Sequence, residues 1–184
     1  MAKIFPEISD KLRAWIEEQP MFFVATAPLS GDGFVNCSPK GLDTLRILDS
    51  ETLAYLDLTG SGAETIAHIQ ENQRMVMMWC AFWGPPRIAR VHGKGEVIYP
   101  DSPKWEEYSK HFEAIPGARA IIVLRGERIS DSCGYGVPEF ELKEQRETLV
   151  KWAERKGPDG IEAYNREKNT ESIDGLAAMG GGES

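Results

Sequence analysis

The chain has few cysteines, no long apolar run and fewer basic than acidic residues. Its three cysteines, Cys37, Cys80 and Cys133, are odd in number and widely spaced, which argues against a disulfide framework and a CxxC metal pair. The longest apolar run, residues 75–83, is too short to span a bilayer. The first residues do not have the pattern of a signal peptide, so we expect a cytoplasmic protein.

Positive charge is also scarce. The 184 residues include 21 Lys and Arg against 29 Asp and Glu, which gives a net charge of −8. This balance argues against nucleic acid and anionic membranes as partners, although a small-molecule site can still be locally basic. The histidines His68, His92 and His111 form no HxH or HxxxH pair, so the sequence predicts no metal site.

Short apolar stretches joined by turns dominate the first 130 residues. Strand-forming segments are separated by Gly, Asp and Pro turns, and one amphipathic helix is inserted after the fourth strand. This order predicts a mainly β protein of the α+β class, built on a closed antiparallel barrel with peripheral helices. The predicted strands are 21–29, 34–40, 44–48, 52–58, 74–82, 87–99 and 118–130, and the predicted helices are 9–19, 62–72 and 102–113.

The composition changes after Ser130. A Gly-rich loop, "DSCGYGVP" (131–138), either forms a tight turn or closes over a ligand with Cys133 or Tyr135. Two polar helices are predicted after it, over 139–156 and 158–168. The predicted divisions are a barrel domain over 1–138, a helical extension packed on the barrel over 139–174, and a disordered tail over 175–184.

The stretch "DLTGSGAETIAHIQENQR" (57–74) is a strand, a Gly-Ser-Gly turn and a helix. Helix N-termini bind anions because their first N–H groups have no intrahelical partner. No cation lies near this turn in the sequence, and Ser61 with Glu64 fits a capping box, which would use up one of those donors. The hydroxyls of Ser38 and Thr59 either bind a ligand or simply end their strands.

These stretches together resemble the FMN-binding split-barrel proteins related to pyridoxamine 5'-phosphate oxidase. The resemblance covers about residues 8–130 and depends on a strand ending in Thr-Gly, a helix ending in Glu-Asn-x-Arg, and the apolar strand that follows. It implies a six-stranded antiparallel split barrel, a homodimer with FMN at the subunit interface, and FMN-dependent oxidoreductase activity on an unassigned small molecule. Alternatives are a deazaflavin or heme as cofactor, and a non-catalytic flavin- or heme-binding storage or sensor role.

The resemblance also implies cofactor-binding positions. Where the known oxidases have Ser-Arg-Lys at the helix start, this chain has Ala-Glu-Thr (63–65), so the cations for a phosphate must come from elsewhere. Lys40 is one candidate. Strand alternation places Arg87 and Arg90 on opposite faces, so one of these two arginines is expected to face the site and is the other candidate. No catalytic side chain is assigned. The predicted cofactor-binding set is Asn36, Cys37, Ser38, Lys40, Leu58, Thr59, Gly60, Thr65, Arg87 and Arg90.

Overall fold

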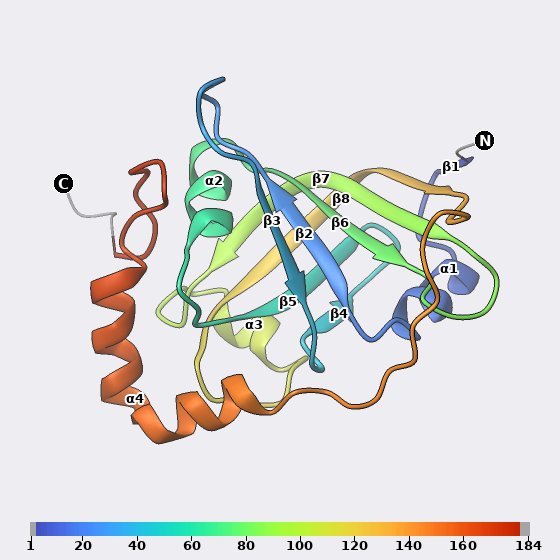
Figure 1. Ribbon diagram of the computed structural model, residues 1–184. Coiled ribbons are helices and arrows are strands. Elements are labelled where there is room, and N and C mark those ends of the chain that lie inside the picture. The colour runs from blue at the N-terminus through green and yellow to red at the C-terminus, as the bar shows by residue number, and fades with distance from the viewer. Residues whose placement is uncertain (1–2, 181–184) are drawn as a thin grey trace.

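A single curled antiparallel sheet of eight strands makes up most of the computed structural model, which describes residues 3–180 (Figure 1). Neighbouring strands follow the order β3-β2-β6-β7-β8-β5-β4, and β1 pairs with β8. The arrangement is an α+β split barrel. The strands are β1 (Lys3–Phe5), β2 (Phe22–Thr26), β3 (Asn36–Lys40), β4 (Leu45–Ile47), β5 (Thr52–Leu58), β6 (Arg74–Cys80), β7 (Ile88–Ile98) and β8 (Ala118–Ser132). The helices are α1 (Asp10–Glu17), α2 (Glu64–Asn72), α3 (Trp105–Ser109) and α4 (Thr148–Lys168).

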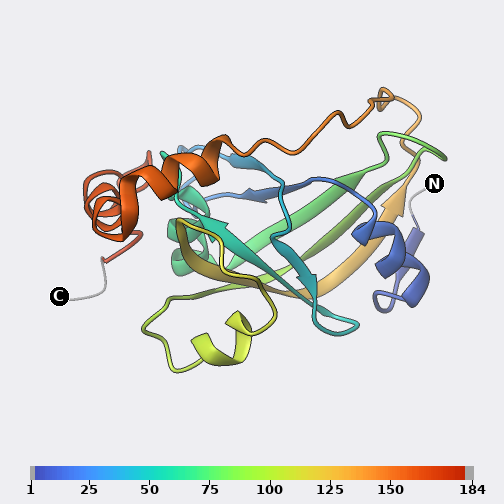
Figure 2. The ribbon, with the colours of Figure 1, turned by 90° about the horizontal axis from the view of Figure 1, so that it is seen from below.

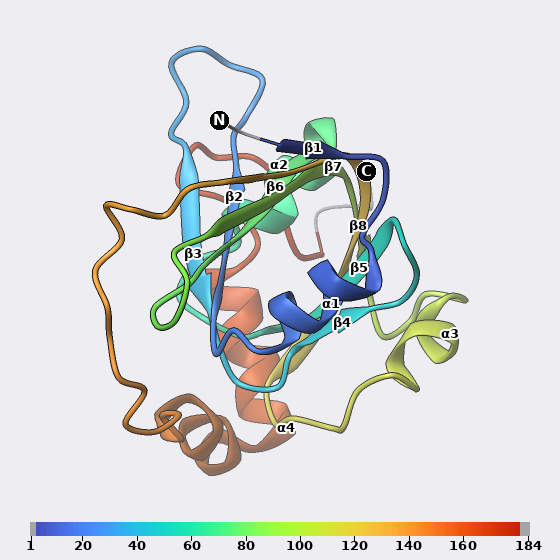
Figure 3. The same cartoon turned by 90° about the vertical axis from the view of Figure 1, so that its right-hand side faces the viewer.

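The main core lies on the inner side of the curled sheet. Along β2, Phe22 and Val24 are buried whereas the residues between them are only half-buried, as the two-residue period of a strand requires. Phe22 stacks on Trp79 of β6 with 6.1 Å between ring centroids. Helix α1 closes one end of this core with Leu12 and Ile16, and Figure 3 shows it across that end of the sheet.

Strand β5 is buried on both faces. Leu53 and Tyr55 belong to the main core, whereas Ala54 and Leu56 pack in a smaller cluster with Tyr108 of α3. A strand held from both sides gives a fixed position to the residues at its end. The turn between β5 and α2 therefore starts from a rigid support.

The structure confirms the predicted strands and helices between residues 9 and 130, with shorter ends for most of them. The predicted helix at 102–113 is reduced to the short α3. All seven strands predicted from the sequence are present, and the described sheet has one more, β1, so it contains eight strands where the resemblance implied six. Strand β1 was missed since its three residues are too few to show a period, and its pairing of Lys3 with Asp131 depends on a partner far away in the sequence.

The predicted helix at 139–156 is wrong over its first half. Residues 133–147, which we call the strap, have no helix and run along the barrel as an extended segment (Figures 1 and 2). The Phe140 N–H donates to the Phe82 carbonyl at 2.8 Å. Gln145 donates to the Pro20 carbonyl at 3.1 Å and accepts from the Leu42 N–H at 3.4 Å. These contacts with the barrel replace intrahelical bonds and override the helical pattern.

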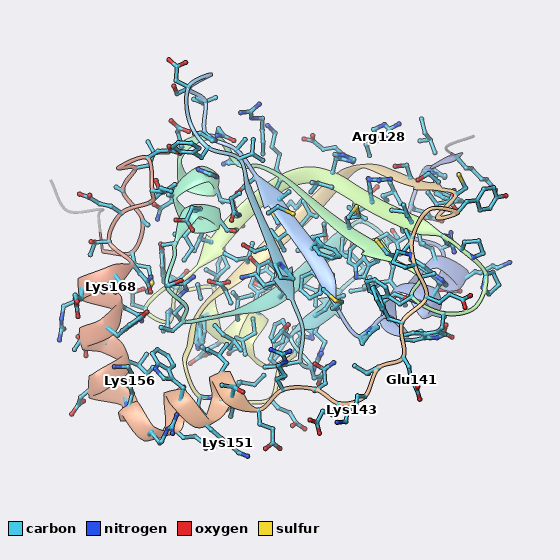
Figure 4. All side chains as sticks on the ribbon, viewed as in Figure 1. Arg128, Glu141, Lys143, Lys151, Lys156 and Lys168 are labelled. Atoms are coloured by element: carbon cyan, nitrogen blue, oxygen red, sulfur yellow. The ribbon has the colours of Figure 1, made fainter. Side chains whose placement is uncertain are left out.

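Helix α4 consists of two halves that meet at Gly157, whose φ of 67° and ψ of 171° are not helical. Pro158 then starts the second half, where its missing N–H costs nothing. Across the kink, the rings of Trp152 and Tyr164 pack edge to face with centroids 5.1 Å apart. Lys156 Nζ lies over both rings, 5.3 Å and 5.1 Å from their centroids, whereas Lys151 and Lys168 are exposed on the outside of the helix (Figure 4).

The chain after α4 folds back onto the barrel. The Met179 N–H donates to the Asn169 carbonyl at 2.9 Å, and Ala178 is buried in the main core with 1% of its surface exposed. The predicted disordered tail is therefore wrong for residues 175–180, and its remainder, 181–184, lies outside the described residues. Within the described range, none of the helices combines the length and the hydropathy needed to cross a bilayer.

Candidate functional site

A cavity of about 1030 Å³ opens where β3, the end of β5 and the start of β8 meet. The turn between β5 and α2 forms one wall, and the strap forms another with Glu144, Gln145 and Arg146. This volume is at the upper end of the range of about 300–1,000 Å³ found for small-molecule sites. Of the predicted cofactor-binding residues, those that line the cavity are Ser38, Lys40, Leu58, Thr59 and Gly60.

A buried ion-pair network lies beside the cavity. Asp57 of β5 is 1% exposed and accepts from Lys40 Nζ at 3.0 Å and from Arg119 Nε at 2.8 Å. Burial alone would raise the pKa of Asp57, but the charges and hydrogen bonds of Lys40 and Arg119 outweigh it and lower that pKa below its usual value. One carboxylate is thus shared by two cations, so these three side chains together carry one positive charge, although the carboxylates of Glu64 and Glu144 and the guanidinium of Arg146 also line the cavity.

The depressed pKa of Asp57 predicts a specific pH dependence of stability. As the pH falls, the unfolded chain protonates this carboxyl first, at about pH 4, and the stabilisation from Asp57 is lost as the pH drops through its lower folded pKa. We expect the difference in free energy of unfolding between the wild type and Asp57→Asn to be constant above about pH 5 and to shrink below about pH 4. Urea unfolding of both chains at pH 7 and pH 3.5 measures it, and an unchanged difference would contradict the ion-pair network.

The turn that precedes α2 has no capping box. Helix α2 begins at Glu64 after an N-cap Ala63, and no side chain caps it. The predicted role of Ser61 as N-cap is therefore wrong. A Cβ at Gly62 would collide with the Glu64 carboxylate, so Glu64 folds back over the turn without capping it. The N–H groups at this helix start remain available for an anion.

Thr59 supplies a polar group that lacks a partner. It is 1% exposed, lines the cavity, and its hydroxyl has no hydrogen-bond partner among the described residues. Its N–H donates to the Gly117 carbonyl at 2.7 Å, which fixes the end of β5 against the start of β8. Six other buried polar atoms of the described chain also lack a partner, but Thr59 is the one among them that lines this cavity, which makes its hydroxyl a candidate contact for a ligand.

Asn36 and Thr65 lie behind the cavity wall in a chain of hydrogen bonds. The Asn36 amide donates to Thr65 Oγ1 at 3.0 Å and accepts from the Ser38 hydroxyl at 3.0 Å. Asn36 also donates to Thr26 Oγ1, which lies 2.9 Å from Nδ1 of the fully buried His68. Burial lowers the pKa of His68. The negative charges of Asp174, Glu64 and Glu71 act to raise that pKa but do not outweigh burial, so the neutral form of His68 is favoured. This network fixes Ser38 at the cavity.

Five members of the predicted set do not line the cavity: Asn36 and Thr65 lie behind its wall, and the other three lie elsewhere in the chain. Cys37 is exposed on the opposite side of β3, because alternate residues of a strand face opposite sides. Arg87 precedes β7, pairs with Asp131 at 2.8 Å and stacks over the Trp15 ring. Arg90 donates to the Ser132 hydroxyl at 3.0 Å. Both arginines thus contact the last residues of β8, whereas the cavity lies at the first.

Arg119, which the sequence analysis did not single out, supplies the cation instead. It is 7% exposed, lines the cavity and donates to Asp57, Asn169 and the Gly62 carbonyl. A signal was present: Arg119 stands in the otherwise apolar "ARAIIVL" of β8, and arginine is rarely buried in a strand without a partner. Its partners Asp57 and Asn169 are far away in the sequence, so the pairing itself had no local pattern.

A second, smaller cavity does not suit an anionic cofactor. It has a volume of about 520 Å³ and lies between Phe82, Trp83 and the strap. Among the described residues that line it, the charged ones are Glu139 and Glu141. No cluster of His, Cys, Asp and Glu within the described residues has the arrangement of a metal site.

The comparisons with known proteins agree with this geometry. The fold and the cavity define a split-barrel protein with a small-molecule site. The family model for pyridoxamine 5'-phosphate oxidase matches residues 8–133, and the chain belongs to this family. A curated relative, the pyridoxamine 5'-phosphate oxidase family protein ustO of Aspergillus flavus, is 38% identical over 97% of this chain and 78% of its own length.

Solved structures share the fold at low sequence identity. A variant of HupZ from Group A Streptococcus matches with a TM-score of 0.54 and 20% identity, over 68% of this chain and 99% of its own. A candidate pyridoxamine 5'-phosphate oxidase from Lactobacillus delbrueckii matches with a TM-score of 0.51 and 17% identity, over 69% and 98%. At these identities the likeness establishes the barrel and not the ligand.

Proposed function

We propose that the protein is an FMN-dependent oxidoreductase that binds its cofactor in the cavity beside Lys40, with the FMN phosphate at the turn between β5 and α2. The observation that carries this proposal is the buried, unpartnered hydroxyl of Thr59 in the wall of that cavity. It lies next to an uncapped helix start and to the network of Asp57, Lys40 and Arg119, whose two cations offset the Asp57 carboxylate and part of the charge of the nearby Glu64. A hydroxyl, free N–H groups and a lysine together suit a phosphate.

The residues of the cavity have separate roles in this proposal. Lys40 supplies charge to the phosphate, Thr59 and the N–H groups of the turn supply hydrogen bonds, and the apolar side chains of Leu56 and Leu58 exclude water from the flavin. Bound FMN supplies the hydride or electron transfer. The protein therefore needs no catalytic triad or carboxylate pair, and its contribution is to hold and orient the cofactor.

Heme is a weaker candidate for this cavity. Heme iron needs an axial ligand such as His, Cys, Tyr or Met. None of the cavity-lining residues in the described chain is a His, Cys or Tyr, and the single sulfur ligand there is Met21. The lining thus favours a flavin, which needs no axial ligand.

A homodimer is part of the proposal. Phe23 and Ala25 of β2 and their sheet partners Met78 and Val76 of β6 are only half-buried on the outer side of the barrel. In Figure 1 no helix of the described chain covers β2 and β3 on this side. A second copy would cover these apolar side chains, and light scattering of the purified protein measures the expected dimer mass.

The Lys40→Met variant tests the phosphate contact. We expect its FMN dissociation constant to rise about 10- to 100-fold, because a charged hydrogen bond to the phosphate is lost. Riboflavin, which lacks the phosphate, should bind with less than a twofold change. Fluorescence titration with both ligands measures this. Lys94→Met is the matched control, since it removes an exposed lysine of β7 and changes the net charge equally.

The first experiment is the visible absorption spectrum of the purified protein, before and after FMN is added and the excess removed. Retained flavin bands, followed by oxidation of a reduced nicotinamide, would support the oxidoreductase. Retained flavin without turnover across electron donors would favour a binding or sensor role. A protein that retains no flavin would overturn the proposal.

A further inference from the structure

Asn169, the residue that follows α4, joins the C-terminal extension to the candidate site. It is fully buried, with 0% of its surface exposed. Its Oδ1 accepts from Arg119 at 2.7 Å, and its Nδ2 donates to the Gly60 carbonyl at 3.0 Å. One amide side chain therefore holds both the arginine and the turn of the cavity wall.

The backbone of Asn169 is fixed as well. Its N–H donates to the Asn165 carbonyl at 2.8 Å, and its carbonyl accepts from the Met179 N–H at 2.9 Å. Because its backbone is held on both sides, the side chain has little freedom to leave Arg119 and Gly60. Asn169 also lies beyond residues 8–133, the range that the family model matches.

These contacts orient the peptide groups of the turn. The Gly60 carbonyl points to Asn169, and the Gly62 carbonyl accepts from Arg119 at 2.9 Å. In a trans peptide the N–H points opposite to the carbonyl, so the N–H groups of Ser61 and Ala63 face away from these two side chains. Neither N–H has an acceptor among the described residues, and Ser61 lines the cavity with the unpartnered Thr59 hydroxyl.

We propose that Asn169 is a positioning residue: it holds the Gly60 carbonyl directly and the Gly62 carbonyl through Arg119, so that the turn presents its N–H groups to the phosphate of FMN. This rests on the proposed function. The C-terminal extension thereby completes the cofactor site of the barrel. Asn169 itself does not touch the phosphate, and it acts through Gly60 and Arg119.

The test compares FMN with riboflavin in the full-length Asn169→Ala variant, after any flavin that copurifies has been removed. We expect the dissociation constant for FMN to rise about tenfold, equivalent to the loss of one hydrogen bond, and that for riboflavin to change less than twofold. A merely structural defect would weaken both ligands alike. Thr170→Ala, at the exposed next residue, is the control and should leave both constants unchanged.

A second variant keeps the proposal testable if Asn169→Ala folds poorly. Asn169→Ser keeps a neutral polar side chain at this buried position, so it adds no charge beside the phosphate, but it is too short to hold both Arg119 and the Gly60 carbonyl. We expect it to stay folded and still to lose FMN affinity relative to riboflavin.

The two proposals fail in different ways. If the wild type binds FMN more tightly than riboflavin and the Asn169 variants keep that ratio, the role of Asn169 is overturned and the proposed function stands. If the wild type binds no flavin, or binds both ligands equally, the phosphate site and the role of Asn169 are both overturned.

Discussion

The Arg119→Met variant is expected to lose about 3 kcal/mol of its free energy of unfolding, because it removes one partner of a buried charged network. Methionine fills much of the space but donates no hydrogen bond. Asp57 still forms its ion pair with Lys40. Three acceptors lose the donor that Arg119 supplied: Asp57 Oδ2, Asn169 Oδ1 and the Gly62 carbonyl. Urea unfolding of the variant and the wild type at pH 7 measures the difference.

Two further variants make this result specific. Arg128→Met removes an exposed arginine of the same strand and should change the free energy by less than about 0.5 kcal/mol. Adding Asp57→Asn to Arg119→Met removes the buried charge that lost its partner, so the double variant should lose less than the sum of the two single losses. Additive losses would mean that Asp57 and Arg119 are not coupled.

Gly93→Ala is expected to have an effect at least as large, about 3 kcal/mol or more, because the new methyl group has no space. A Cβ at Gly93 would collide with the Arg125 carbonyl oxygen and lie 2.8 Å from its carbon. These are backbone atoms of the neighbouring strand, so no side chain can rotate away. Gly93 stands opposite Gly126 at the register shift between β7 and β8, where the two strands approach closely.

The measurement for Gly93→Ala is the unfolding free energy, or the soluble yield if the variant does not fold. Gly31→Ala is the control, since a Cβ there meets no atom within 4 Å. The control should behave like the wild type within about 0.5 kcal/mol. Equal stability of Gly93→Ala and the wild type would show that the two strands separate at little cost.

The barrel was predictable from the sequence because its strands and α2 carry strong local patterns. β2 alternates buried and half-buried residues, and the long β7 and β8 follow clear turns. The strap was not predictable, because residues 139–147 have a helical composition and are held extended by contacts with Pro20, Leu42 and Phe82. Long-range contacts of this kind leave no periodic signal in the segment itself.

The candidate site was predictable only where it is local. Lys40, Thr59 and Gly60 end a strand or begin a turn, and those positions are visible in the sequence. The sequence pattern assigned the phosphate-binding arginine to Arg87 or Arg90. The arginine that lines the cavity is Arg119, which is held there by Asp57, 62 residues away in the sequence. The Ser61 capping box matched its motif but did not form, because the helix begins at Glu64, two residues later than the predicted start at residue 62.

The return of the chain to the barrel after α4 has a consequence for biosynthesis. Asp57 and Arg119 leave the ribosome well before Asn169, and Ala178 enters the main core from almost the end of the sequence. Since domains fold as their N-terminal segments emerge, a nascent chain forms most of the sheet while the turn at residue 60 still lacks its anchor. The cavity wall is complete only after Asn169 has emerged, so a chain truncated before that residue keeps the barrel sequence but not the finished site.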